Sequence, residues 1–409
     1  MEPEKNIPCS LRDFLLYFLY LGAFGFGGPI ALAGYMQRDL VEKRRWISKE
    51  DYLDGLALAQ LAPGPLAAQL AMYLGYVRAG ILGATLVSLA FILPSFLMVL
   101  AISWIYVRFG GHGWMQALFY GIGAAVIGII VRSAYKLAKL TLGRDKFLWA
   151  IFAALMLATA VTRTEIAILF LAAGVLYMLI KAPFKTKSAG PLFSLAPLAA
   201  AGTAPSGAGQ AAAAAAHGYP RTVAAQSFFI GKMAAASSAR ILLFFSKAGA
   251  MVFGSGLAIV PFLYGGVVKE YHWLNERQFM DAVAVAMITP GPVVITVAFI
   301  GYLVRGFSGA CLAALGVFLP VYLFVVIPSP WFKKHSKNPQ LNAFVKGVTA
   351  AATGAIAGAC LVLAHKAVFD IPTAVIALAA LGLLIRFKIQ EPFLILLAGA
   401  AGLLFFRST

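Results

Sequence analysis

Long stretches without a charged residue alternate with short clusters of lysine and arginine along the whole chain. A charged side chain at the centre of a bilayer costs roughly 2.5–3.5 kcal/mol on insertion scales, so uncharged runs of about twenty residues predict transmembrane helices. Each half of the chain has four runs of 19 to 29 residues and then two of 15 or 16 residues, and Lys247 alone interrupts one of them. The runs are 14–37, 55–77, 79–107, 109–131, 147–162, 166–180, 241–268, 282–304, 306–332, 347–365, 371–385 and 392–406.

Individual residues repeat between the halves as well. The repeat predicts an internal duplication, and therefore an all-α integral membrane protein made of two homologous repeats of about six transmembrane segments. The predicted domains are residues 1–187 and 240–409, separated by the Ala/Gly/Ser/Pro-rich residues 188–239. At a common spacing of 227 positions, Phe26-Gly27, Trp46, Asp54 and Pro63-Gly64-Pro65 recur as Phe253-Gly254, Trp273, Asp281 and Pro290-Gly291-Pro292.

The segment 188–239 decides how the repeats are oriented. It is either a flexible linker or a weakly hydrophobic extra span. If it stays on one side, the repeats are parallel, and if it crosses, they are inverted. In the first half, eleven basic residues fall on the side of the N-terminus and seven on the other side, whereas the equivalent loops of the second half carry four and eight. The positive-inside rule therefore favours inverted repeats.

Composition agrees with a membrane protein. Hydrophobic residues make up 61% and charged residues 12% of the 409, whereas soluble globular chains average about 45–50% and 25%. Lysine and arginine number 33 against 15 acidic residues. Because these cations cluster between apolar runs, membrane topology and contact with lipid headgroups explain the excess better than nucleic-acid binding does.

No pattern of catalytic or metal-binding residues is present in the sequence. The three cysteines are far apart without a CxxC spacing, and the five histidines are scattered at the edges of the runs. Neither a disulfide framework nor a metal site is expected. We predict a protein that is not an enzyme and uses no cofactor.

Proline and glycine interrupt the apolar runs at matching places in both halves. Pro-Gly-Pro cannot continue a helix, so a new half-helix should begin near Pro65 and Pro292. The N-terminus of a half-helix exposes unpaired N–H groups and about half a positive charge, which makes an anion site. Matching breaks in two repeats indicate a transporter's substrate site, although kinks that only allow close helix packing are the alternative. The candidate substrate-binding residues are Gly27, Gly28, Pro29, Gln60, Pro63, Gly64, Pro65, Lys247, Gly254, Gly256, Thr289, Pro290, Gly291 and Pro292.

Ionisable residues inside the runs allow two interpretations each. Lys247 is either a fixed cation facing an anion pathway or a lysine that extends to the membrane interface. Asp54 and Asp281 stand at the starts of the broken runs. They are either proton-coupling carboxylates or, as the pattern favours, partners of helix N-termini.

The chain resembles the chromate ion transporter family in its long, two-domain form. The resemblance rests on residues 24–29 (Phe-Gly-Phe-Gly-Gly-Pro), the loop from Trp46 to Asp54, and residues 62–65 (Ala-Pro-Gly-Pro), and it covers both halves. The second copy lacks the Gly-Gly-Pro of the first, which leaves open whether both halves contribute equally to a site.

The resemblance implies a multi-pass protein of the prokaryotic plasma membrane that exports chromate, uses the proton-motive force and confers chromate resistance. Protons are then the candidate coupling ion, and homo-oligomers are left open. The residues themselves indicate only an anion, of tetrahedral shape, held by backbone dipoles. A passive anion channel and a transporter of another anion such as sulfate remain the alternatives.

Overall fold

The computed structural model describes residues 7–110, 112–162, 167–182, 237–251, 256, 259–335, 338–368, 370–387, 389 and 391–406, and these residues form helices and loops without a strand. The expected linker, residues 188–239, falls almost entirely outside them, so its crossing of the membrane stays a prediction.

The helices of the two halves follow one another in the same order. Those of the first half are α1 (Leu11–Phe24), α2 (Gly28–Met36), the π-helix η1 (Gln37–Lys43), α3 (Lys49–Leu61), α4 (Leu66–Phe109), α5 (Gly113–Leu142), α6 (Lys146–Thr162) and α7 (Ala167–Lys181). Those of the second half are α9 (Ser238–Met251), α10 (Ile259–Leu263), the π-helix η3 (Tyr264–Glu270), α11 (Glu276–Ile288), the 3₁₀ turn η4 (Val293–Ile295), α12 (Thr296–Val326), α13 (Ser329–His335), α14 (Pro339–Ala367), α15 (Ile371–Arg386) and α16 (Glu391–Phe405).

The backbone repeats in detail, including its irregular parts. α4 is kinked at Ala79 (φ −149°, ψ 32°) and Gly80 (φ 59°, ψ −147°). α12 has the same kink at Arg305 (φ −148°, ψ 27°) and Gly306 (φ 63°, ψ −151°). Each π-helix of one half also has its counterpart in the other. Such coincidences confirm the internal repeat that the residue spacing predicts.

The predicted helix breaks are present. α1 ends at Phe24, and Gly27 (φ 106°) and Gly28 (φ 73°) turn the chain into α2 with left-handed backbone angles that suit glycine. α3 ends at Leu61, and α4 begins after Pro65. A helix of 14 residues, such as α1, is about 21 Å long and cannot cross a hydrocarbon core of about 30 Å. The first two apolar runs are therefore pairs of half-helices, and the count of six spans in each half stays a prediction.

Four helical segments in the described part of the chain are long and apolar enough to cross a membrane: Leu66–Phe109, Gly113–Lys136, Val293–Phe332 and Pro339–Val362. α4 shows the pattern that lipid requires. Its Leu82, Leu89 and Leu97 are exposed, whereas Val87 and Phe91 are fully buried. Large apolar side chains on the outside and the inside of one helix indicate a lipid-facing surface.

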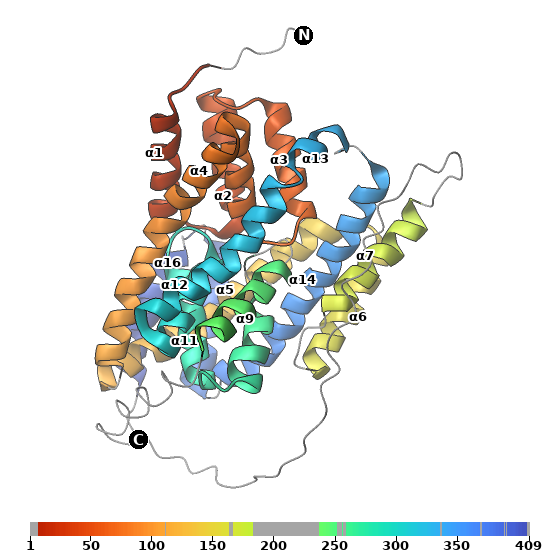
Figure 1. The fold of residues 1–409 in the computed structure, drawn as a ribbon. Coiled ribbons are helices and arrows are strands. Elements are labelled where there is room, and N and C mark those ends of the chain that lie inside the picture. The colour runs from red at the N-terminus through yellow and green to blue at the C-terminus, as the bar shows by residue number, and fades with distance from the viewer. Residues whose placement is uncertain are drawn as a thin grey trace.

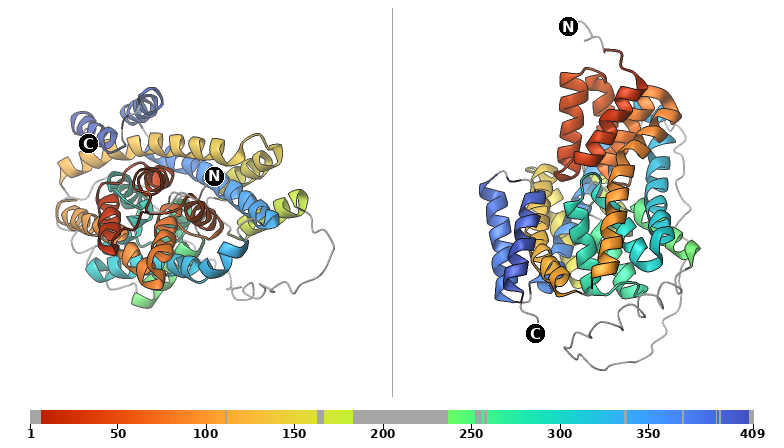
Figure 2. Two further views of the ribbon diagram at one scale, coloured as in Figure 1. Left: turned by 90° about the horizontal axis from the view of Figure 1, so that it is seen from above. Right: turned by 90° about the vertical axis from the view of Figure 1, so that its left-hand side faces the viewer.

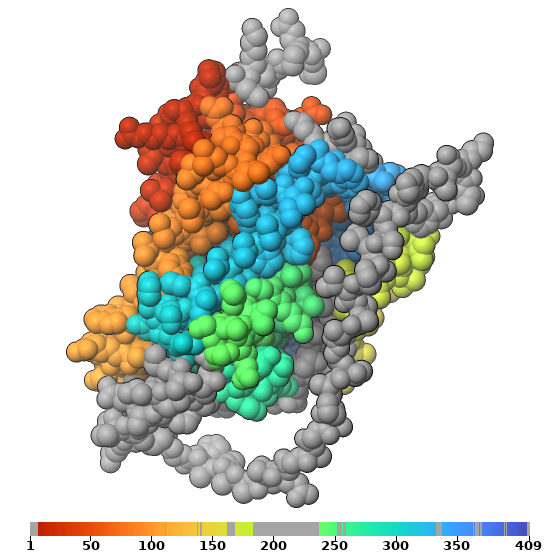
Figure 3. Space-filling view, viewed as in Figure 1, coloured from red at the N-terminus to blue at the C-terminus, as the bar shows by residue number. Residues whose placement is uncertain are grey.

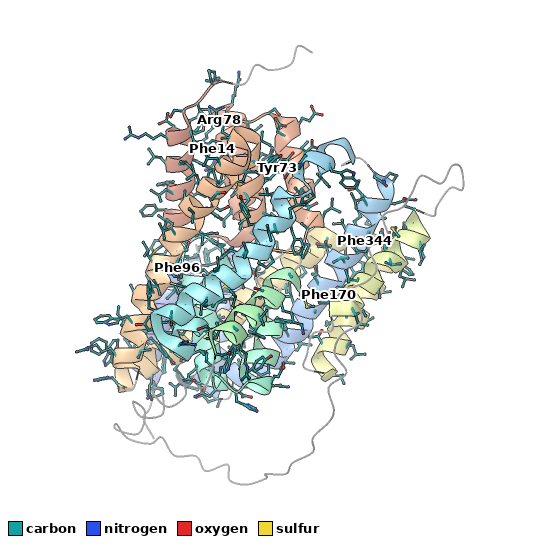
Figure 4. The ribbon with its side chains drawn as sticks, viewed as in Figure 1. Phe14, Tyr73, Arg78, Phe96, Phe170 and Phe344 are labelled. Carbon is teal, nitrogen blue, oxygen red and sulfur yellow. The ribbon has the colours of Figure 1, made fainter. Side chains whose placement is uncertain are left out.

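The closing helices of each half pack on the other half. α15 and α16 pack on α5, whereas α6 and α7 pack on α14, as Figure 2 shows for α15 and α16, in blue. In Figure 4, Phe170 of α7 and Phe344 of α14 lie where α7 packs on α14. The main hydrophobic cluster contains buried residues of both halves, so the two halves share a core.

The broken helices of the two halves lie at different ends of the molecule. Figure 1 shows α1, α2 and α3 in its upper half, whereas α9 and α11 lie in the lower half. α12 packs on both α4 and α9, and Figure 3 shows it crossing the molecular surface between them. The two sets of half-helices thus meet near the middle of the molecule.

Candidate functional site

The Pro-Gly-Pro break of each half lies against the long helix of the other half. The N–H of Gly291 donates to the carbonyl oxygen of Gly25 at 2.8 Å, and Ser95 of α4 donates to the carbonyl of Gly22 at 3.1 Å. A Cβ at Gly291 would collide with the Ser95 hydroxyl, and one at Gly64 would approach Val321 of α12 to 3.0 Å. Beyond the Pro-Gly-Pro breaks the repeat spacing is 226, as the kinks at Ala79 and Arg305 show. Positions 95 and 321 are therefore repeat counterparts, and both breaks make the same contact.

Beside this meeting point lies a cavity of about 270 Å³. Its volume is below the roughly 300–1,000 Å³ of pockets for drug-sized ligands, which suits a small solute. Both halves contribute to its wall. The lining residues are Gly27, Gly28, Pro29, Ile30, Gln60, Leu66, Arg132, Ser133, Lys136, Thr141, Met287, Val293, Val345, Lys346, Thr349 and Glu391.

The charges around the cavity favour an anion. Arg132 and Lys136 come from α5 and Lys346 from α14, and Glu391 at the start of α16 is the one acidic residue in the lining. Three cations and one carboxylate leave a net charge of +2. Within the described part of the chain, Glu391 forms no ion pair with a cation within 4.0 Å, so the cations of the lining are not neutralised by direct pairing with it.

The N-terminus of α2 adds to this positive field. Gly27 caps α2 without a side-chain hydrogen bond, and Pro29 occupies the first turn. The first N–H groups of a helix have no partner within it, and they carry about half a positive charge. Because Gly27 and Gly28 line the cavity, this helix end can bind an oxyanion through backbone N–H groups.

Only part of the predicted site lines the cavity. Four predicted residues do so: Gly27, Gly28, Pro29 and Gln60. Gly256 lies behind the wall, where its Cβ would stand 3.3 Å from that of Val293. Gly254 lies outside the described residues. The residues of the two Pro-Gly-Pro breaks lie beside the cavity, not in its lining, and they position the elements that form it: Pro63, Gly64, Pro65, Thr289, Pro290, Gly291 and Pro292.

Lys247 is exposed on α9 and does not line the cavity. Its role as a substrate ligand therefore stays a prediction without support from this geometry. The surroundings of the cavity supply other cations in its place.

The sequence interpretation missed Arg132, Lys136, Lys346 and Glu391. The three cations were counted among the loop residues because they lie outside the uncharged runs. In the structure α5 continues to Leu142 and α14 already begins at Pro339, so the basic residues lie within helices. The spacing of four between Arg132 and Lys136, which puts both on one helix face, was the available signal.

Comparison with known proteins points to one family. The family model described as chromate transporter matches residues 12–178 and 239–403. A chromate transport protein of Cupriavidus metallidurans is 58% identical over 395 residues, which cover 96% of this chain and 92% of that protein. A probable chromate transport protein of Synechococcus elongatus is 52% identical over 410 residues, covering 97% and 96%. A chromate transport protein of Pseudomonas aeruginosa is 32% identical over 410 residues, covering 98% and 93%. No solved structure matches the chain.

Proposed function

Because this chain belongs to the chromate transporter family, we propose that it exports chromate across the plasma membrane of a prokaryote by secondary active transport. The proton-motive force drives the export, and the export confers chromate resistance. The curated relatives bear the name of chromate transport proteins, and the direction, the driving force and the membrane are parts of this proposal.

The cavity is the observation that carries the proposal. Chromate is a tetrahedral dianion, and the lining offers a net charge of +2 together with the free N-terminus of α2. Arginine and lysine form charge-assisted hydrogen bonds with oxyanions. Backbone N–H groups at Gly27 and Gly28 approach the oxyanion closely because neither residue carries a side chain.

The arrangement of the halves supports alternating access. The repeats are inverted, and the segment 188–239 crosses the membrane between them. This part of the proposal rests on the charge bias of the loops and on the placement of α1–α3 and of α9 and α11 at different ends of the molecule. Half-helices that approach the cavity from the two sides can open it first to one side and then to the other.

Transport by the purified protein in liposomes tests the proposal. With an imposed pH gradient we expect saturable accumulation of labelled chromate, and preloaded unlabelled chromate should accelerate uptake by counterflow. Protein-free liposomes are the control. Flux that does not saturate and shows no counterflow would establish a passive channel instead. Sulfate has the same shape and charge, so stronger inhibition by sulfate than by unlabelled chromate would make sulfate the substrate.

A further inference from the structure

Asp281 is a buried carboxylate within α11, and among the described residues it has one hydrogen-bond partner. Its side chain is 5% exposed, and the hydroxyl of Tyr106 on α4 donates to its Oδ2 at 2.6 Å. The ring of Tyr106 is itself held edge-on by Phe119 of α5 and Phe299 of α12, at centroid distances of 5.3 and 5.1 Å. Aromatic packing therefore fixes the hydroxyl in its place beside the carboxylate.

Few charged groups of the described residues act on this carboxylate. Arg277, one turn earlier on α11, attracts it and donates to the carbonyl of Gln116 on α5 at 3.4 Å. Burying an ionised carboxylate is unfavourable unless nearby charges compensate it. Such surroundings favour the protonated, uncharged form of a carboxyl. The carboxyl can therefore bind a proton and release it again. α4, α5, α12, α16 and η3 pack against α11 and carry the other titratable groups. Two of these are engaged elsewhere: Tyr120 of α5 donates to Asp370, and Tyr264 of η3 donates to Glu276. The others are Tyr73, Tyr76, Arg78 and Arg108 of α4, Arg132, Tyr135, Lys136 and Lys139 of α5, Lys269 and Glu270 of η3, Tyr302, Arg305, Cys311 and Tyr322 of α12, and Glu391 of α16.

A helix-dipole role does not explain Asp281. The dipole effect falls off within the first turn, where α11 has Glu276 and α3 has Glu50 and Asp51. Asp281 is the sixth residue of α11, beyond that turn. The interpretation of Asp54 and Asp281 as partners of helix N-termini is therefore corrected.

The repeat counterpart of Asp281 lacks the tyrosine. Asp54 is partly exposed on α3, and its side chain makes no hydrogen bond to another described residue. The position equivalent to Tyr106 in the second half is Phe332, which is buried on α13 and has no hydroxyl. If the carboxylate served only the fold that both repeats share, its surroundings would be the same in both halves. The pair is thus a specialisation of one half.

α11 connects the pair to the cavity. Met287 lies six residues after Asp281, about 9 Å along the helix, and lines the cavity. Beyond the end of α11, the N–H of Gly291 donates to Gly25, two residues before the glycine that caps α2 at the cavity. A displacement of α11 therefore changes the wall of the cavity and the support of the α2 N-terminus together.

We propose that Asp281, paired with Tyr106, is the proton-binding site through which the pH gradient drives transport. The proposal rests on the proposed function and adds the residue that carries the coupled proton. A proton from water adds to a carboxylate oxygen of Asp281 when the pair opens to the side of lower pH. The carboxylate loses its charge and its need for Tyr106 as a donor, which frees α11 to move. The proton leaves to water when the pair opens to the other side.

The decisive experiment compares Asp281→Asn with Asp54→Asn, its counterpart in the repeat, in liposomes. Two fluxes of labelled chromate are measured: exchange against internal chromate at equal pH, and net accumulation under a pH gradient. We expect Asp281→Asn to keep exchange within about twofold of the unchanged protein and to lose accumulation. Asp54→Asn should keep both. Accumulation by Asp281→Asn at the rate of the unchanged protein would overturn the proposal, and so would loss of exchange by a protein that remains monodisperse.

Tyr106→Phe provides a second variant that keeps the aromatic packing. The lost hydroxyl stabilised the charged carboxylate, so the proton should bind at higher pH. The pH of half-maximal driven transport should rise by about one unit, the size expected for one hydrogen bond to a charged group. An unchanged pH profile would contradict the proposal. If the unchanged protein exchanges chromate but no pH gradient drives it, the proton coupling of the proposed function fails before these variants are compared.

Discussion

The backbone N–H of Gly291, in the second half, donates to the carbonyl oxygen of Gly25, in the first half, at 2.8 Å. This bond joins the Pro-Gly-Pro break of one repeat to the end of the first half-helix of the other. Gly291 has a φ of 91° and no room for a Cβ beside Ser95. The two halves thus meet through backbone atoms, where side chains would keep them apart.

Replacing Gly291 tests this contact. Gly291→Ala combines a positive φ, which costs a non-glycine residue about 1–2 kcal/mol, with a collision at Ser95. We expect a fall of at least about tenfold in maximal chromate flux while the protein still inserts in the membrane. Adding Ser95→Ala removes the colliding hydroxyl and should restore part of the flux. Flux unchanged in Gly291→Ala would mean that the break serves packing alone, and the same holds for Gly64→Leu in the first half.

The cations of the cavity can be separated from Lys247 by one pair of variants. Lys346→Met and Lys247→Met remove the same charge and keep a similar apolar stem. Because Lys346 lines the cavity and Lys247 does not, we expect the chromate concentration at half-maximal flux to rise about tenfold or more in Lys346→Met, the effect of one lost bond to a charged group. Lys247→Met should match the unchanged protein. The reverse result would return Lys247 to the substrate site.

The helix breaks could be predicted from the sequence, whereas the cavity could not. Proline and glycine act locally, so the breaks at Pro63–Pro65 and Pro290–Pro292 follow from the residues alone. The cavity cannot be predicted from the residues alone, because Arg132 and Lys346 come from α5 and α14, which belong to different halves. These two helices pack on each other although they are far apart in the sequence, and no local sequence pattern encodes such a contact. Gly27 and Gly28 were identified as site residues since their position at a half-helix start is again local.

Inversion of the repeats has a direct test by labelling. Lys43 and Glu270 are exposed repeat counterparts at the ends of η1 and η3. Each is changed to cysteine in a chain without the three native cysteines, and intact vesicles are treated with a membrane-impermeant maleimide. Inverted repeats place the two positions on opposite sides, so one should react only after the vesicles are permeabilised. Equal reaction of both in intact vesicles would establish parallel repeats.

An ion pair joins the loop before α6 to the end of α7. Lys181 lies 3.0 Å from Asp145 and, by its hydrogen bond, lowers the pKa of that carboxyl to about 2. A lowered pKa means that the stabilisation is complete above the ordinary value near 3.8 and is lost only as the pH falls through about 2. Lys181→Met should therefore lower the melting temperature slightly and by the same amount at pH 5 and pH 8. A loss seen only at pH 8 would contradict the lowered pKa.

Glu391 sets the net charge of the cavity. Its carboxylate repels a dianion. Glu391→Gln removes this negative charge, which raises the net charge of the lining from +2 to +3, and keeps the size of the side chain. We expect chromate to bind more tightly, with the concentration at half-maximal exchange falling about threefold to tenfold, and to leave more slowly, so that maximal flux falls as well. Glu391→Gln combined with Lys346→Met restores a net charge of +2 and should return binding toward that of the unchanged protein. Measuring exchange at several ionic strengths separates this effect from a change in shape, because electrostatic binding weakens with added salt. Equal binding by Glu391→Gln and the unchanged protein at low salt would show that Glu391 does not share the cavity with the transported anion.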